Sequence, residues 1–141
     1  MNPTPSLTAV MLAAGSLIAA CTSSGAGADS FPSSFMSDQG KLKIELSSQP
    51  EQPPYAGNGS LELVLTDAKT GEPVDGENIT LVPFMPTMGH GTDTIPVMQA
   101  MKDGHYVFTN VNLYMPGEWQ LRFQFSGPVD DSAAPDIPNV Q

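Results

Sequence analysis

One short segment of the chain combines sulfur and nitrogen donors in a way that suits a soft metal ion. The thioethers of Met85 and Met88 and the imidazole of His90 fall within six consecutive residues. Pro86 stiffens this segment and the glycines at 89 and 91 let it bend, which is typical of a loop. Loops are mostly polar, so methionines placed there indicate either a bound ligand or a docking partner.

Copper is the metal that this donor set fits. Thioether sulfur is a soft donor that selects Cu(I), and imidazole binds copper in both oxidation states. A thioether carries no proton to lose, so it keeps binding in acid, and it does not form disulfides as a thiol does. Met85, Met88 and His90 are therefore the predicted ligands. Packing of the two methionines against the loop is the alternative interpretation.

Further potential donors follow along the chain. Of the six methionines after residue 21, five lie between residues 85 and 115. Met115 either closes the site or packs, and the sequence leaves both outcomes open. Because methionine is by default a core filler, we expect Met98, Met101 and His105 to be packing or surface residues.

The sequence indicates no enzyme. Neither histidine stands near a nucleophile motif, and no glycine-rich phosphate loop follows a strand. Asp130 and Asp131 lie in a proline-rich segment, where a rigid acid–base pair is not expected. The turn with Asp75 and Glu77 has too few carboxylates at regular spacing for a Ca²⁺ site.

The elements that must position these residues are β-strands. Apolar and polar residues alternate in 42–47, 61–66 and 119–126, and segments rich in glycine and proline separate them. No segment combines a helical period with a helix cap. We expect an all-β fold, an immunoglobulin-like antiparallel β-sandwich of six to seven strands. Its predicted core includes Leu63, Phe108, Trp119, Leu121 and Phe123.

Smaller features support this fold. Tyr106 follows a glycine turn at the start of a strand, which is typical of the tyrosine corner of Greek-key sandwiches. The alternation changes phase between 106–108 and 111–113, which predicts a β-bulge near Asn110. Pro96 is expected to interrupt a strand, and residues 137–140 could add a short last one.

The N-terminus has the pattern of a bacterial lipoprotein. An apolar run over 7–20 ends in small residues directly before Cys21, which predicts a cleaved signal peptide over 1–20 and lipidation at Cys21. Because Cys21 is used in this way, it cannot ligate blue copper, which needs a cysteine. We expect a flexible tether over 21–40 and a folded domain over 41–141 with an acidic, proline-rich tail from about 127.

The charge excludes several kinds of partner. The chain has 15 acidic and 5 basic residues, for a formal net charge of −10. Nucleic acid binding needs a basic surface, so no nucleic acid partner is expected. Anionic lipid headgroups also attract basic residues, so the expected membrane contact is the lipid anchor.

The motifs over 41–127 resemble the YtkA-like domain family, which is related in architecture to FixH-type and CopC-type β-sandwiches of the export compartment. The resemblance lies in the methionine- and histidine-bearing loop at 85–91 and in the turn from Met115 to Trp119. It implies a non-enzymatic domain associated with copper handling or oxidase maturation. The ligand set that it implies is Met85, Met88, His90 and Met115.

Together these observations predict a membrane-anchored copper-binding protein that sequesters or delivers Cu(I) in the periplasm or cell envelope. Besides copper, the expected partner is a copper-handling or oxidase-assembly protein. The alternative is a structural or adaptor sandwich, in which the methionines form an exposed apolar patch that docks a partner protein.

Overall fold

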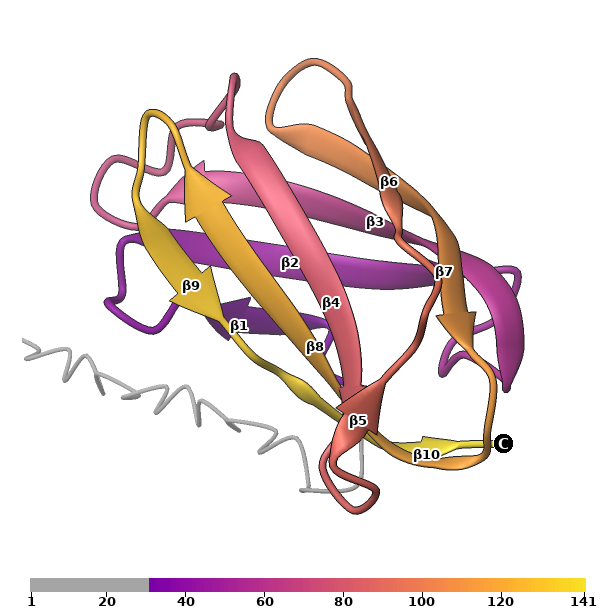
Figure 1. Ribbon diagram of the computed structural model, residues 1–141. Helices are drawn as coiled ribbons and strands as arrows, with labels where there is room; N and C mark the ends of the chain where they lie inside the picture. Colours follow the sequence, from indigo (N-terminus) through magenta and orange to yellow (C-terminus); the bar gives the residue numbers. More distant parts are fainter. Residues whose placement is uncertain (1–30) are drawn as a thin grey trace, which may run out of the picture.

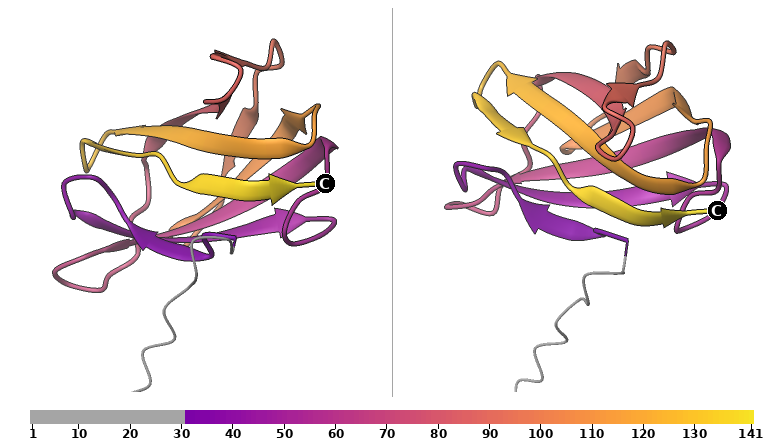
Figure 2. Two further views of the ribbon diagram at one scale, coloured as in Figure 1. Left: turned by 90° about the horizontal axis from the view of Figure 1, so that it is seen from below. Right: turned by 60° about the horizontal axis from the view of Figure 1, so that its bottom comes forward.

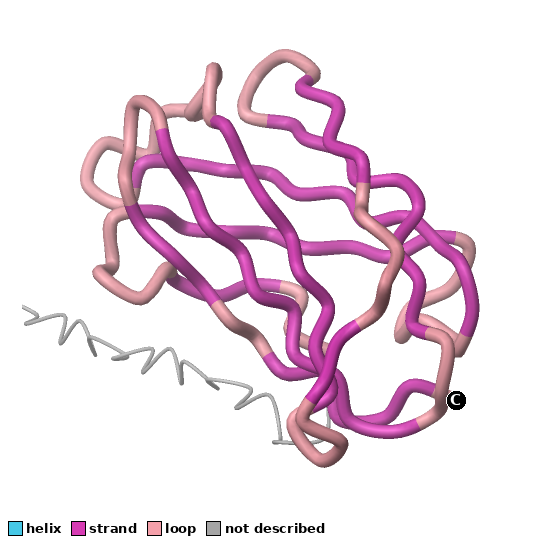
Figure 3. The backbone as a smooth tube through the Cα atoms, viewed as in Figure 1, coloured by secondary structure: helices cyan, strands magenta, loops and turns pink. Residues whose placement is uncertain are grey.

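The alternating segments of the sequence form antiparallel strands in the computed structural model, which describes residues 31–141 (Figure 1). In β2 (Leu42–Gln49), Leu42 and Ile44 are buried whereas Lys43 and Glu45 are exposed, so one face of the strand meets the core and the other meets solvent. Strands and loops make up the described residues, with no helix among them (Figure 3).

The strands form two sheets that lie as two layers (Figure 2, left). The first sheet has the order β1–β2–β3–β7–β6, with β1 (Ser34–Met36), β3 (Gly57–Asp67), β6 (Val97–Ala100) and β7 (His105–Leu113) beside β2. The second has the order β10–β8–β4–β5, with β4 (Asn78–Met85), β5 (His90–Gly91), β8 (Gly117–Ser126) and β10 (Asp136–Val140); β9 (Asp131–Ala133) also pairs with β8.

The antiparallel β-sandwich predicted from the sequence is confirmed. Residues 31–141 contain ten strands, more than the expected six to seven. The additional strands are edge segments of two to five residues, such as β1, β5 and β9. Segments this short are held by pairing with a neighbour, so they show little alternation of their own.

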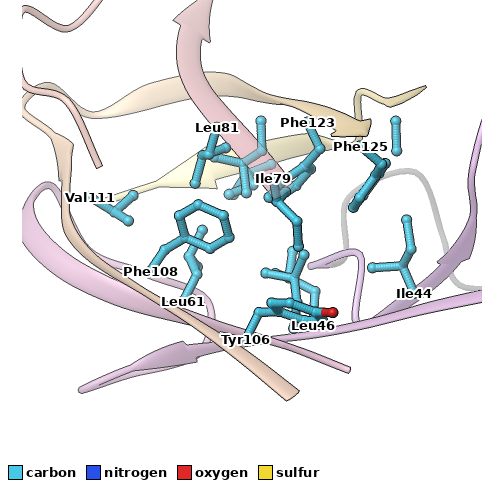
Figure 4. Close-up of a cluster of buried hydrophobic side chains, with 14 of the residues drawn as sticks. Ile44, Leu46, Leu61, Ile79, Leu81, Tyr106, Phe108, Val111, Phe123 and Phe125 are labelled. Carbon is cyan, nitrogen blue, oxygen red and sulfur yellow. The ribbon is translucent and has the colours of Figure 1, made fainter. Parts of the chain in front are cut away.

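The core fills the space between the two layers (Figure 4). Phe108 of the first sheet and Phe123 of the second meet edge to face, with ring centroids 6.1 Å apart. All five predicted core residues are buried, each at most 2% exposed: Leu63, Phe108, Trp119, Leu121 and Phe123. The sequence therefore identified the residues on which the sandwich packs.

The predicted tyrosine corner is present. The Tyr106 hydroxyl donates a 2.7 Å hydrogen bond to the Val74 carbonyl and accepts one from the Glu77 amide. The preceding turn needs glycine, because Gly104 has φ +74° and a Cβ there would lie 2.4 Å from the Leu65 carbonyl oxygen.

The predicted bulge near Asn110 is present. Asn110 has φ +59°, and the pairing of β3 with β7 shifts register beside it, as expected for a bulge. Pro96 precedes a strand rather than interrupting one, because β6 begins directly after it.

The folded domain begins before residue 41, within the segment 21–40 that was predicted to be a flexible tether. Residues 34–36 pair with β2, and Phe31 and Phe35 pack against the core. Ser37 is buried and its hydroxyl donates a 2.6 Å hydrogen bond to the Asp131 carboxylate. Two aromatic residues within this serine-rich segment supply the apolar surface that attaches it to the sandwich.

The C-terminal segment from 127 is part of the sandwich rather than a free tail. Ala133, Ile137 and Val140 are buried, and β10 confirms the short last strand expected near 137–140. Asp131 is only 2% exposed and is held rigidly by four hydrogen bonds, from Ser37 and from the amides of Gln39, Lys41 and Ser132.

The predicted signal peptide and Cys21 lie outside the described residues. Within 31–141, no helix has the length and apolar character needed to cross a membrane.

Candidate metal-binding site

The predicted ligand loop is a tight hairpin between β4 and β5. The Met85 carbonyl accepts hydrogen bonds from the amides of Met88 and Gly89, at 3.2 and 2.9 Å. Met85 and His90 are directly paired across the hairpin, so their side chains project from the same face, with Cβ atoms about 5 Å apart. A Cβ at Gly91 would lie 2.5 Å from the Pro83 carbonyl oxygen, so the close approach of β5 to β4 requires glycine.

Met85 is the last residue of β4. The prediction from the sequence that it lies in a loop is therefore wrong. It is in phase with the buried residues Ile79 and Leu81 and is only 3% exposed. Its methyl carbon lies 3.2 Å from the position that a Cβ on Gly117 would take. The Met85 side chain therefore extends from the core to the turn between β7 and β8, which carries Met115.

Met88 occupies the tip of the same hairpin and is 53% exposed. The two methionines that the sequence grouped together are thus in different environments, one buried and one in solvent. A thioether at an exposed hairpin tip is accessible to a ligand or to a partner protein from outside.

His90 is held by Tyr114, a residue that the sequence analysis did not single out. The Tyr114 hydroxyl lies 2.9 Å from His90 Nδ1, and the two rings stack with centroids 6.2 Å apart and planes 8° apart. The Gly91 carbonyl oxygen is 3.2 Å from the same nitrogen. A proton on Nδ1 satisfies both oxygens and leaves the lone pair of Nε2 for a metal.

The turn that carries Tyr114 and Met115 is attached to the core. The Trp119 indole donates a 2.9 Å hydrogen bond to the Met115 carbonyl, and the Tyr114 ring meets the Trp119 ring edge to face at 5.4 Å. Met115 itself is half-buried and packs against the core. The position of Tyr114 directly before Met115 is the signal in the sequence that could have identified it.

Met85 and His90 therefore lie at the same end of the sandwich as the turn of Met115, because Met85 approaches Gly117 and His90 contacts Tyr114. Beside His90 is an open hollow whose lining includes Asp93, Asn112 and Tyr114. Within residues 31–141, no three side chains of the histidine, cysteine, aspartate or glutamate type converge as a metal site. The methionine sulfurs are the further donors at this end of the molecule.

The remaining candidates lie outside the β4–β5 hairpin and the turn of Met115. Met98 is half-buried against the core, and Met101 is 53% exposed. His105 lies at the start of β7 and contacts Glu62, with 3.2 Å between Nδ1 and Oε1.

The chain belongs to the YtkA-like family, whose model matches residues 36–124. This confirms the resemblance inferred from the motifs. No curated protein matches the chain. A solved structure similar to it is that of a DUF4426 family protein from Pseudomonas aeruginosa PAO1, with 10% sequence identity and a TM-score of 0.46, covering 72% of this chain and 91% of the other.

Proposed function

We propose that this protein binds Cu(I) at the end of the sandwich where the β4–β5 hairpin meets the β7–β8 turn. The proposed ligands are the thioethers of Met85 and Met115 and Nε2 of His90, with Met88 at the hairpin tip. The observation that carries the proposal is the pairing of Met85 with a His90 imidazole that Tyr114 holds through Nδ1.

The donor chemistry favours Cu(I) over other ions. Two or three thioethers and one imidazole form a soft site, whereas Ca²⁺ and Mg²⁺ require oxygen ligands. Zn²⁺ is bound by thiolate, imidazole or carboxylate, and of these only His90 belongs to the proposed set.

The different exposures of the methionines suggest how copper moves. Met85 is buried and would retain the ion, whereas Met88 is accessible from outside. An exposed thioether can receive copper from a donor or pass it to a recipient, which supports sequestration or delivery rather than catalysis. The recipient class would be a copper-handling or oxidase-assembly protein.

We also propose that the domain acts outside the cytoplasm, attached to a cell-envelope membrane by lipid on Cys21. The apolar run before Cys21 supports this localisation. Phe31 and Phe35 already pack against the core of the sandwich.

Anaerobic titration of the purified protein with Cu(I), against a chromophoric chelator of known affinity, tests the proposal. We expect Cu(I) to be withdrawn from the chelator, and no comparable binding of Zn²⁺, Ca²⁺ or Mg²⁺. Failure to compete for Cu(I) favours the adaptor alternative, in which the exposed side chains of Met88 and Tyr114 dock a protein.

A further inference from the structure

A second pair of soft and borderline donors lies on the β6–β7 hairpin. In β6 and β7 the last paired residues before the turn are Ala100 and Tyr106. The next residues toward the turn are Met101 and His105, and the Met101 amide donates a 2.8 Å hydrogen bond to the His105 carbonyl. Met101 and His105 therefore face each other across the hairpin. Because Tyr106 points into the core, its neighbour His105 points to the outer face of the sheet, and so does Met101.

His105 has the geometry of an imidazole prepared to bind a metal. Glu62, on the adjacent strand β3, places Oε1 3.2 Å from His105 Nδ1. A carboxylate that accepts a hydrogen bond from Nδ1–H fixes the tautomer and the ring orientation, and it makes Nε2 a better donor. Nε2 is then the ring nitrogen left for a metal, and Met101 lines the same hollow as His105.

The backbone around this pair is rigid. Gly104 accepts a hydrogen bond from the Leu65 amide at 2.8 Å, and its own amide donates one to Asp75 at 2.7 Å. The turn before His105 is thus attached to β3 and to the neighbouring loop. A rigid frame keeps the two donor side chains opposite each other at little entropic cost.

The surrounding surface is a shallow hollow lined by Glu62, Ala100, Met101, Lys102, His105 and Val107. The Glu62 carboxylate is engaged by His105, and Lys102, which lines the same hollow, carries a positive charge. Little net negative charge is left for a hard divalent cation. The donors that remain are one thioether and one imidazole nitrogen, which favours Cu(I).

We propose that Met101 Sδ and His105 Nε2 form a second Cu(I) site on the outer face of the first sheet, with Glu62 as its positioning residue. The β6–β7 hairpin and the β4–β5 hairpin lie at opposite ends of the sandwich (Figure 1). The two sites share no residue, so Cu(I) binding at the second site does not depend on the first site.

The test uses the Met85→Leu/Met88→Leu/His90→Ala variant, which lacks all the proposed ligands of the first site except Met115, with ¹³C-labelled methionine methyl groups. Under anaerobic titration with Cu(I), we expect the Met101 methyl resonance to shift. The Met36 resonance, from an exposed methionine in β1, is the matched control and should stay in place. An unchanged Met101 resonance at saturating Cu(I) overturns the proposal.

Further substitutions in that background separate ligation from structure. Met101→Leu conserves apolar volume and should abolish the remaining Cu(I) binding while the spectrum stays that of a folded protein. Glu62→Ala should weaken Cu(I) binding about 10- to 100-fold, as loss of an orienting partner does. The amide oxygen of Glu62→Gln can still accept a hydrogen bond from Nδ1–H, so this variant should restore much of the Cu(I) affinity. If His105→Ala binds Cu(I) as tightly as its parent, the proposal is wrong.

The first site is tested separately in the Met101→Leu/His105→Ala variant, through the Met85 methyl resonance. If the Met101 methyl resonance shifts in its variant and the Met85 methyl resonance does not shift in the other, the second site is established and the first is rejected. Failure of one site is therefore distinguishable from failure of the other.

Discussion

The Tyr114 hydroxyl lies 2.9 Å from Nδ1 of His90, and the two rings are stacked. These residues come from different segments, one before β8 and the other in β5, so their contact joins the hairpin to the turn. The arrangement orients the imidazole before any ligand arrives, and it makes Tyr114 the residue that connects His90 to Trp119 and the core.

Tyr114→Phe should lower the Cu(I) affinity about 10- to 100-fold, because it removes the nearer of the two oxygens around Nδ1 and keeps the ring. The free energy of unfolding should change little, since the stacking on His90 and the contact with Trp119 persist. Competition titration and thermal melting of the variant measure the two effects. Tyr55→Phe, which removes the same atom from an exposed tyrosine in the β2–β3 loop, is the control and should bind as the parent does. Equal affinity of Tyr114→Phe and the parent would show that the Tyr114 hydroxyl does not contribute to Cu(I) binding.

Asp131 should make the domain sensitive to acid. Burial raises the pKa of this carboxyl, but hydrogen bonds from Ser37, Ser132, Gln39 and Lys41 outweigh burial and lower it. With a folded pKa below the unfolded one, the carboxylate stabilises the domain fully above a pH of about 3.9, and this contribution is lost as the pH falls through the folded value.

Asp131→Asn should therefore lower the free energy of unfolding by about 1–3 kcal/mol at pH 7, and the difference from the parent should shrink toward pH 2. Urea denaturation at several pH values, followed by circular dichroism, checks this. A constant difference across that range would mean that the charge of Asp131 is not involved. Asp38→Asn, which alters an exposed carboxylate bonded to Ser132, is a suitable control.

Glu77 should have the opposite pH dependence. Burial raises the pKa of its carboxyl, the hydrogen bond from the Val129 amide lowers it and the charge of Asp130 raises it, for a net upward shift. Within residues 31–141, Oε2 of this buried side chain has no hydrogen-bond partner. A raised folded pKa gives stability that is complete below a pH of about 4.3 and is lost as the pH rises through the folded value.

Glu77→Gln keeps an acceptor for the Val129 amide and removes the buried charge. The free energy of unfolding should rise by roughly 1 kcal/mol at pH 7 and be unchanged or lower at pH 4. Urea denaturation at both pH values distinguishes this from a simple packing change, which would shift both values equally.

The sequence was sufficient for the long strands and for the core, because most of each long strand alternates and its apolar side chains face one common interior. It did not reveal β1 or β9, whose pairing with β2 and β8 depends on partners remote in sequence. The hydrogen bond between Ser37 and Asp131 joins residues 94 positions apart, and no local pattern predicts such a contact.

The candidate site was predictable only in part. Met85 looked like a loop residue because Pro86 and the glycines at 89 and 91 follow it. Pro83, before it, lies in phase with Leu81 and is buried, so β4 continues to Met85. A proline is tolerated at position 83 because β5 pairs only with Phe84 and Met85. The edge of β4 at Pro83 has no neighbouring strand that would require a backbone N–H from this residue. Tyr114 was missed because its role depends on a contact between two separate turns.

Cys21→Ser should release the protein from the membrane fraction, because the lipid is the proposed attachment. Fractionation of cells expressing either form, with mass spectrometry of the N-terminal peptide, measures this. The parent should show a lipid-modified N-terminus at Cys21. An intact N-terminal Met1 in the parent would contradict the lipoprotein assignment.

The anaerobic Cu(I) competition titration of the Met85→Leu/Met88→Leu variant tests the central proposal most directly. Leucine conserves the apolar volume of methionine, so an apolar docking patch would survive whereas a sulfur ligand set would not. The titration should be run in a protein that also carries Met101→Leu/His105→Ala, so that the β6–β7 hairpin contributes no Cu(I) binding. Met98→Leu in the same background is the control. We predict that the double variant loses at least tenfold in Cu(I) affinity and that the control loses none. Cu(I) binding by the double variant as tight as in its parent would contradict the copper site and leave the adaptor function in its place.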